Sequence, residues 1–165
     1  MIFPKEIHAF CTLWRNWQRY NITFEMKQDT LFARFLIKLQ TCLLNEELLT
    51  GEPPNAALII PAKNPEPGDI QVWDDVVELT ISIGNMFHCH FDPTVFVDGN
   101  VSQEEAEQKC IDSAVAFIED FLAEKTILYV KFSNGKPGMS GIVNCQNEET
   151  IPKNARKFIW SGPID

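Results

Sequence analysis

Two histidines and an aspartate lie at alternate positions near the middle of the chain, at His88, His90 and Asp92. Alternate residues of a β-strand point to the same face, so a strand would present both imidazoles and the carboxylate together. A strand spaces such side chains by roughly 6.5–7 Å, and two of them can share a metal ion only when other ligands complete its shell. One hypothesis is a metal-binding protein or a small hydrolase that uses these three residues. The other is a polar or partner-facing sheet surface.

Acidic residues gather just ahead of this segment. Asp74 and Asp75 are adjacent, and Glu78 follows shortly after them. Other carboxylate pairs occur along the chain, so no single pair can be assigned as a general acid and base. Solvated or partner-facing surfaces explain the pairs better. The candidate partner-binding residues are therefore Asp74, Asp75, Glu78, His88, His90 and Asp92.

The sequence motifs of common enzymes do not occur. The chain has no Gly-x-Ser-x-Gly nucleophile elbow, no His-Glu-x-x-His zinc motif and no dinucleotide-binding fingerprint. The glycines around Lys136 do not follow the order of a phosphate-binding loop, and a hairpin explains them better. We therefore expect no catalytic residue, no cofactor, no resident metal ion and no enzymatic activity.

Charge and composition narrow the class of partner. The chain has 165 residues, of which 45 % are hydrophobic, enough for one domain with a substantial core. It carries 23 acidic side chains against 14 lysines and arginines, which gives a net charge of −9. A protein that neutralises many phosphates needs the opposite sign, so we expect no direct binding of nucleic acid.

The chain is expected to be cytoplasmic. Its first residues do not resemble a secretory signal, and its apolar runs are far shorter than the roughly 18 residues of a membrane span. Its five cysteines are widely spaced, with no Cys-x-x-Cys pair, which favours reduced thiols over a disulfide framework. We expect no membrane association.

The first 50 residues are predicted to be largely helical. Apolar residues recur at helical spacing over residues 5–20, and again from Leu31 to Leu43. Asp29 or Thr30 can cap the second helix, which is expected to end before Gly51. Five prolines lie between residues 52 and 68, so this stretch is predicted to be a connection with one short extended segment.

A β-hairpin is predicted next, because the apolar period changes to two from Val76 onward. Its second strand alternates from Phe87 to Asp92. A two-residue loop would set Ile81 opposite His88, whereas a three-residue loop sets Ile81 opposite Cys89. The longer loop keeps each face of the hairpin chemically uniform, so it is favoured.

The remainder is predicted to be a helix, a second hairpin and a last strand. Ser102 and Glu105 have the spacing of a capping box, and an apolar stripe that includes Phe117 and Phe121 follows to about Glu124. Strands are expected at 126–132, 139–145 and 156–160, with a turn at 133–138. The predicted fold is a single α+β domain over residues 1–165, with a mainly antiparallel sheet of about five strands and three principal helices packed on one face.

Three segments carry a resemblance to a known class of protein. They are residues 72–84 (VWDDVVELTISIG), 88–92 (HCHFD) and 121–126 (FLAEKT). In pattern and size, residues 70–145 resemble small bacterial immunity proteins of polymorphic and contact-dependent toxin systems. The resemblance implies an acidic, cytoplasmic α+β protein that binds a toxin domain and has no activity of its own. It assigns no individual binding residue.

Charge agrees with this resemblance. A toxin that cuts nucleic acid is basic around its active site, and an inhibitor with a net charge of −9 would be steered toward it. The leading hypothesis is an immunity protein that blocks a cognate, basic, nuclease-type toxin domain. The alternatives are the metal-binding protein or hydrolase described above and a plain interaction module of a larger assembly.

Overall fold

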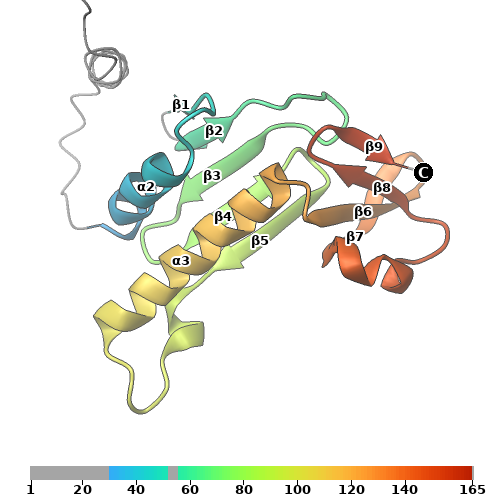
Figure 1. Ribbon diagram of the computed structural model, residues 1–165. Helices are drawn as coiled ribbons and strands as arrows, with labels where there is room; N and C mark the ends of the chain where they lie inside the picture. Colours follow the sequence, from blue (N-terminus) through green and yellow to red (C-terminus); the bar gives the residue numbers. More distant parts are fainter. Residues whose placement is uncertain (1–29, 52–55, 165) are drawn as a thin grey trace, which may run out of the picture.

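The structure, a computed structural model, describes residues 30–51 and 56–164. The α+β class is confirmed, but the expectation of one sheet is wrong, because the strands form two separate antiparallel sheets (Figure 1). The first sheet has five strands and the second has four. They are separate because β6 pairs with β7 and β8 and not with a strand of the first sheet.

Helix α2 (Leu31–Cys42) begins where the sequence predicts. The side chain of Thr30 accepts a hydrogen bond of 3.1 Å from the backbone N–H of Ala33, which satisfies one of the free donors of the first turn. The helix ends at Cys42, before Gly51 as expected, and a short strand follows at residues 49–50. The helix predicted over residues 5–20 lies outside the described residues.

The first sheet is a meander in which each strand pairs with the next one along the chain. The sequence missed β1 and β3, whereas the short extended segment predicted within the proline-rich stretch is β2. The predicted strand from Val76 starts only at Leu79. The strands are β1 (Leu49–Thr50), β2 (Leu58–Ile60), β3 (Ile70–Asp74), β4 (Leu79–Ile83) and β5 (Phe87–Phe91).

The register of the β4–β5 hairpin is the one that the uniform-face argument favours. Ile81 lies opposite Cys89, and Ser82 lies opposite His88. The hairpin therefore presents one apolar face and one polar face.

Helix α3 (Gln103–Leu122) follows the short 3-10 helix η1 (Pro93–Phe96). Its N-terminus is capped as predicted, since the Ser102 hydroxyl accepts a bond of 3.2 Å from the backbone N–H of Glu105. The apolar stripe of α3 faces the core, and Phe121 is completely buried. Phe117 is only half-buried.

The second sheet has the strand order β7-β6-β8-β9. The turn expected at 133–138 is shorter, because Asn134 and Gly135 both adopt positive φ and close the β6–β7 hairpin at once. The strand β9 was not predicted. The elements are β6 (Thr126–Ser133), β7 (Lys136–Asn144), the 3-10 helix η2 (Cys145–Thr150), β8 (Arg156–Ile159) and β9 (Gly162–Ile164).

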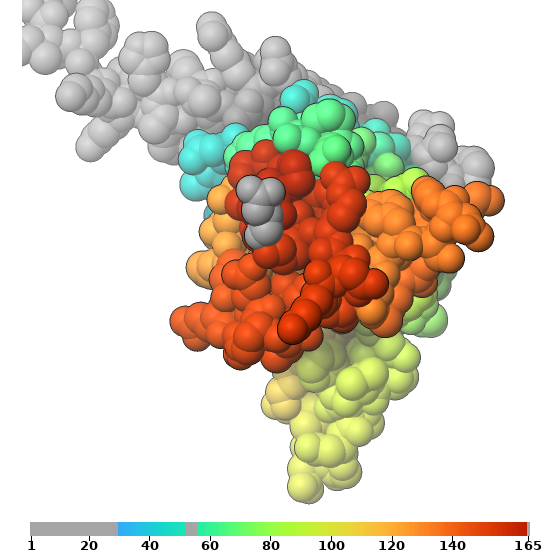
Figure 2. Space-filling model, turned by 90° about the vertical axis from the view of Figure 1, so that its right-hand side faces the viewer, coloured from blue at the N-terminus to red at the C-terminus, as the bar shows by residue number. Residues whose placement is uncertain are grey.

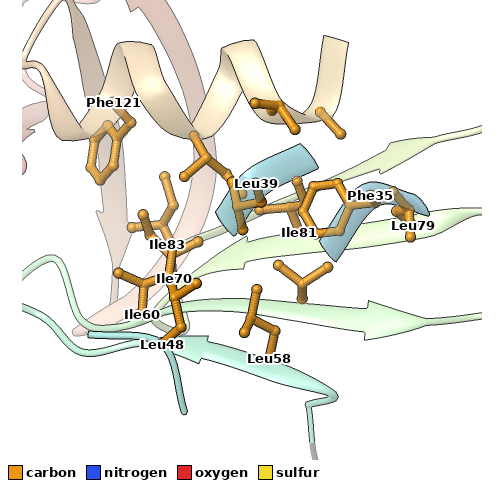
Figure 3. Close-up of a cluster of buried hydrophobic side chains, with 14 of the residues drawn as sticks. Phe35, Leu39, Leu48, Leu58, Ile60, Ile70, Leu79, Ile81, Ile83 and Phe121 are labelled. Carbon is orange, nitrogen blue, oxygen red and sulfur yellow. The ribbon is translucent and has the colours of Figure 1, made fainter. Parts of the chain in front are cut away.

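Helices α2 and α3 cover the same face of the first sheet (Figure 1). Phe35 and Leu39 of α2 pack over buried strand residues such as Ile81 (Figure 3). At the end of α3, Phe121 contacts Trp160 beyond β8, with ring centroids 5.9 Å apart. The apolar core is therefore continuous from the first sheet to the second. Within residues 30–51 and 56–164, no helix is long and apolar enough to cross a membrane.

Candidate functional site

The polar side chains of the first sheet lie on the face that α2 and α3 do not cover. The register places Trp73, Thr80 and His90 in one row across β3, β4 and β5. Ser82 and His88 lie side by side in the next row. We call this surface the open face. Its polarity follows from the alternation of the strands, because the intervening residues are buried beneath the helices.

Hydrogen bonds fix His90 on the open face. Its Nδ1 lies 2.9 Å from Oε1 of Glu78 and 3.1 Å from the hydroxyl of Thr80. Thr80 donates its only proton to Asp75 over 2.6 Å, so its oxygen can only accept from His90. This geometry assigns a proton to Nδ1 of His90, and the imidazole orients Glu78 and Thr80 in turn.

His88, His90 and Asp92 do not converge on a metal position. The two imidazoles meet edge to face with centroids 5.5 Å apart. The carboxylate of Asp92 instead accepts a bond of 2.8 Å from the backbone N–H of Thr94, which caps η1 and lowers the pKa of Asp92. Among the described residues, no group of three or more histidine, cysteine or acidic side chains could hold a metal ion.

The structure brings the four acidic candidates to one end of the first sheet. Leu79 pairs with Phe91, so the β3–β4 turn and the segment after β5 leave the sheet at the same end. The segment that follows β5, including η1, projects away from the second sheet, as the yellow-green part of Figure 2 shows. We call this surface the acidic end and define it as Asp74, Asp75, Glu78 and Asp92.

Two valines stand out from the turn between these carboxylates. The side chains of Val76 and Val77 are 80 % and 74 % exposed, and Val95 on η1 is 77 % exposed. Val76 has a φ of 70°, a backbone conformation that costs a β-branched residue strain. The alternation predicted from Val76 onward puts Val77 on the apolar face of a strand, with Leu79 and Ile81. The preceding Asp74 was the signal against it, because its carboxylate accepts the N–H of Val76 and closes a turn.

A shallow groove of about 530 Å³ lies where the open face meets the second sheet. Trp73, Ser82 and His88 line it from the open face, and Pro137 and Ser140 line it from β7. The hydroxyl of Ser82 is buried and has no hydrogen-bond partner. Sequence reasoning missed this groove, because nothing in the residues indicated that β7 approaches the first hairpin.

The buried thiols are not nucleophiles at neutral pH. Cys89 lies on the apolar face of β5, as strand alternation predicts, and burial raises the pKa of its thiol to about 12. Burial likewise raises the pKa of Cys110 to about 11, and its Sγ contacts the carbonyl of Phe91 at 3.2 Å. A reactive cysteine needs the opposite shift.

The chain was compared with protein families, curated proteins and solved structures. No protein-family model, no curated protein and no solved structure matches the chain.

Proposed function

We propose that the protein is an immunity protein, which binds and neutralises a cognate, basic, nuclease-type toxin domain in the cytoplasm. The observation that carries this proposal is the acidic end, where three carboxylates flank two exposed valines on a strained turn and Asp92 lies at the same end of the sheet. The proposal needs no catalytic residue, because blocking the toxin is itself the activity.

The carboxylates of the acidic end are held in position before any partner arrives. Asp74 and Asp92 each accept a backbone N–H, Asp75 accepts the hydroxyl of Thr80, and Glu78 is paired with His90. A preorganised surface loses less side-chain freedom on binding than free side chains would. The acidic end can therefore offer fixed negative charges to lysines and arginines around the active site of a nuclease.

The valines give this surface an apolar centre within a charged rim. Protein interfaces commonly have this arrangement, in which the centre excludes water and the rim stays polar. Burial of Val76 and Val77 against a partner would remove apolar surface from water and so favour binding. Charges at the rim mainly accelerate association, while the packed centre slows dissociation.

A metal-binding protein or hydrolase would need Asp92 beside His88 and His90. The carboxylate of Asp92 caps η1 instead. A plain interaction module would use the same acidic end, and it differs from an immunity protein only in the consequence of binding. Inhibition of a toxin therefore separates these two functions.

The test is co-expression with a basic nuclease toxin domain, sought among the genes that neighbour this one. Cells producing both proteins should survive, and the purified protein should abolish cleavage of nucleic acid at a one-to-one ratio. Binding without inhibition would leave only an interaction module. Absence of both binding and protection would contradict the proposed function.

A further inference from the structure

The groove at the edge of the open face is lined by a polar group that has no hydrogen-bond partner. Ser82 is 6 % exposed, and its Oγ has neither a protein partner nor contact with solvent. A buried hydroxyl without a partner costs free energy, roughly 1–3 kcal/mol for a polar group in proteins. Strand alternation directs Ser82 toward the open face and it lines the groove, so rotation about its Cα–Cβ bond can turn the buried hydroxyl toward a group seated there.

The lining of the groove selects for an uncharged ring. Trp73 and Pro137 supply flat apolar surface, and His88 adds an imidazole. No aspartate, glutamate, lysine or arginine of the described chain lines the groove. A charged ligand would lose hydration there without gaining a counter-charge, whereas a neutral aromatic ring would bury apolar area.

The groove is continuous with the acidic end. Thr80 lines the groove and also donates its hydroxyl proton to Asp75 of the acidic end. A partner seated on the acidic end would therefore reach the groove with a neighbouring loop. The groove is also open and shallow, which suits one side chain of a protein better than an enclosed small molecule.

We infer that the groove binds a tyrosine side chain of the same partner, with its ring against Trp73 and its hydroxyl hydrogen-bonded to Ser82. This inference rests on the proposed function. Tyrosine combines the apolar ring and the single neutral hydroxyl that the groove calls for, and it is enriched at protein interfaces.

The groove can be tested on the full chain with 4-methylphenol, which reproduces the tyrosine side chain, and toluene, which lacks the hydroxyl. The indole N–H resonance of Trp73, assigned with Trp73→Phe, reports binding by NMR. We expect 4-methylphenol to shift this resonance at millimolar concentration. Ser82→Ala should weaken that binding about threefold to tenfold, the worth of one neutral hydrogen bond, and leave toluene unaffected.

A matched control variant is Thr126→Val. Thr126 also has a buried hydroxyl without a partner, but it lies on β6 and does not line the groove. Its removal should leave the affinity for 4-methylphenol unchanged. No shift of the Trp73 resonance, or equal affinity in Ser82→Ala and wild type, would overturn the inference.

A second measurement separates this inference from the proposed function. If wild-type protein binds the toxin domain, saturation with 4-methylphenol should weaken that binding several-fold. Undiminished binding would overturn the tyrosine inference and leave the acidic end in place. If wild-type protein fails to bind the toxin domain at all, the proposed function fails, and the tyrosine inference fails with it.

Discussion

At the scale of single residues, two glycines determine how closely the chain can fold at the end of the sheet opposite the acidic end. Gly68 and Gly84 both have positive φ, and the backbone N–H of Gly84 donates to Asp69 over 2.8 Å. A Cβ on Gly84 would lie 2.5 Å from the carbonyl oxygen of Pro67. The sequence indicated a turn at Gly84, but the contact with a distant loop could not be predicted from it.

Gly84→Ala should therefore destabilise the protein more than Gly135→Ala. Both residues have positive φ, but a Cβ on Gly135 meets nothing within 4 Å. The backbone strain is common to both variants, so the clash should add roughly 1–3 kcal/mol to the loss at Gly84. Urea unfolding measures both free energies. Equal losses of unfolding free energy in the two variants would show that the loop before β3 moves to accommodate the added Cβ without an energetic penalty.

Two phenylalanines of α3 that have the same predicted role differ in burial. Phe121 and Phe117 share the predicted apolar stripe, but only Phe121 is completely buried. Phe117 packs against Phe87 and Phe91 of β5, with centroid distances of 6.1 and 5.6 Å. It stays half-buried because β5 is the edge strand of its sheet.

Phe121→Ala should cost roughly 3–5 kcal/mol, the range for a buried aromatic residue. Phe117→Ala should cost at least about 1 kcal/mol less, because part of its ring surface already contacts water. Chemical denaturation of the two variants compares these losses. A larger loss at Phe117 would contradict the burial described here.

At the scale of elements, the sequence predicted what depends on local pattern. The caps at Thr30 and Ser102 and the register of the first hairpin follow from side chains close in the chain. It failed for β1 and β3, which flank the proline-rich stretch, although it predicted the extended segment that forms β2. It could not divide the strands between two sheets, since pairing between distant strands leaves no local signal.

One part of the candidate site could be predicted from the sequence, and the other part could not. The gathering of Asp74, Asp75 and Glu78 with Asp92 near the first hairpin follows from hairpin pairing, and the structure places them at one end. The groove required β7 to meet the open face, a contact between elements far apart in the chain.

Polar contacts between α2 and α3 predict a pH effect on stability. Lys38 donates to Asp112, and this hydrogen bond lowers the pKa of Asp112. A carboxyl whose pKa is lowered by folding stabilises the protein above its unfolded pKa, and that contribution disappears as the pH falls through the folded value. Both groups are partly exposed, so the contribution should stay below about 1 kcal/mol.

Asp112→Asn should therefore flatten the decline of stability as the pH falls from about 5 to 2, the range in which aspartates titrate. Lys38→Met should flatten it to a similar extent, because it removes the main cause of the shift. Urea unfolding at several pH values measures the slope. An unchanged slope of unfolding free energy against pH in both variants would show that the Lys38–Asp112 pair does not stabilise the packing of α2 on α3.

At the scale of the whole molecule, a continuous core holds two sheets together and leaves one end of the larger sheet free to meet a partner. The net charge of −9 gives the protein a long-range attraction for basic proteins. The acidic end concentrates four of these charges at the end of the sheet that carries the exposed valines. Partner binding at this end is the central claim, and it depends on where the charges lie as well as on how many there are.

The most direct measurement is the association rate of the toxin domain with two double variants that change the net charge equally. Asp74→Lys with Asp75→Lys reverses the acidic end, and Glu47→Lys with Glu149→Lys reverses exposed carboxylates outside it. Circular dichroism and thermal melting should first show that both variants are folded.

At about 0.1 M salt, we predict at least tenfold slower association for the variant reversed at the acidic end. The Glu47 and Glu149 variant should stay within about threefold of wild type, since charges beyond a Debye length of roughly 10 Å at 0.1 M salt contribute little. Equal slowing in both variants would show that only net charge matters and would contradict binding at the acidic end.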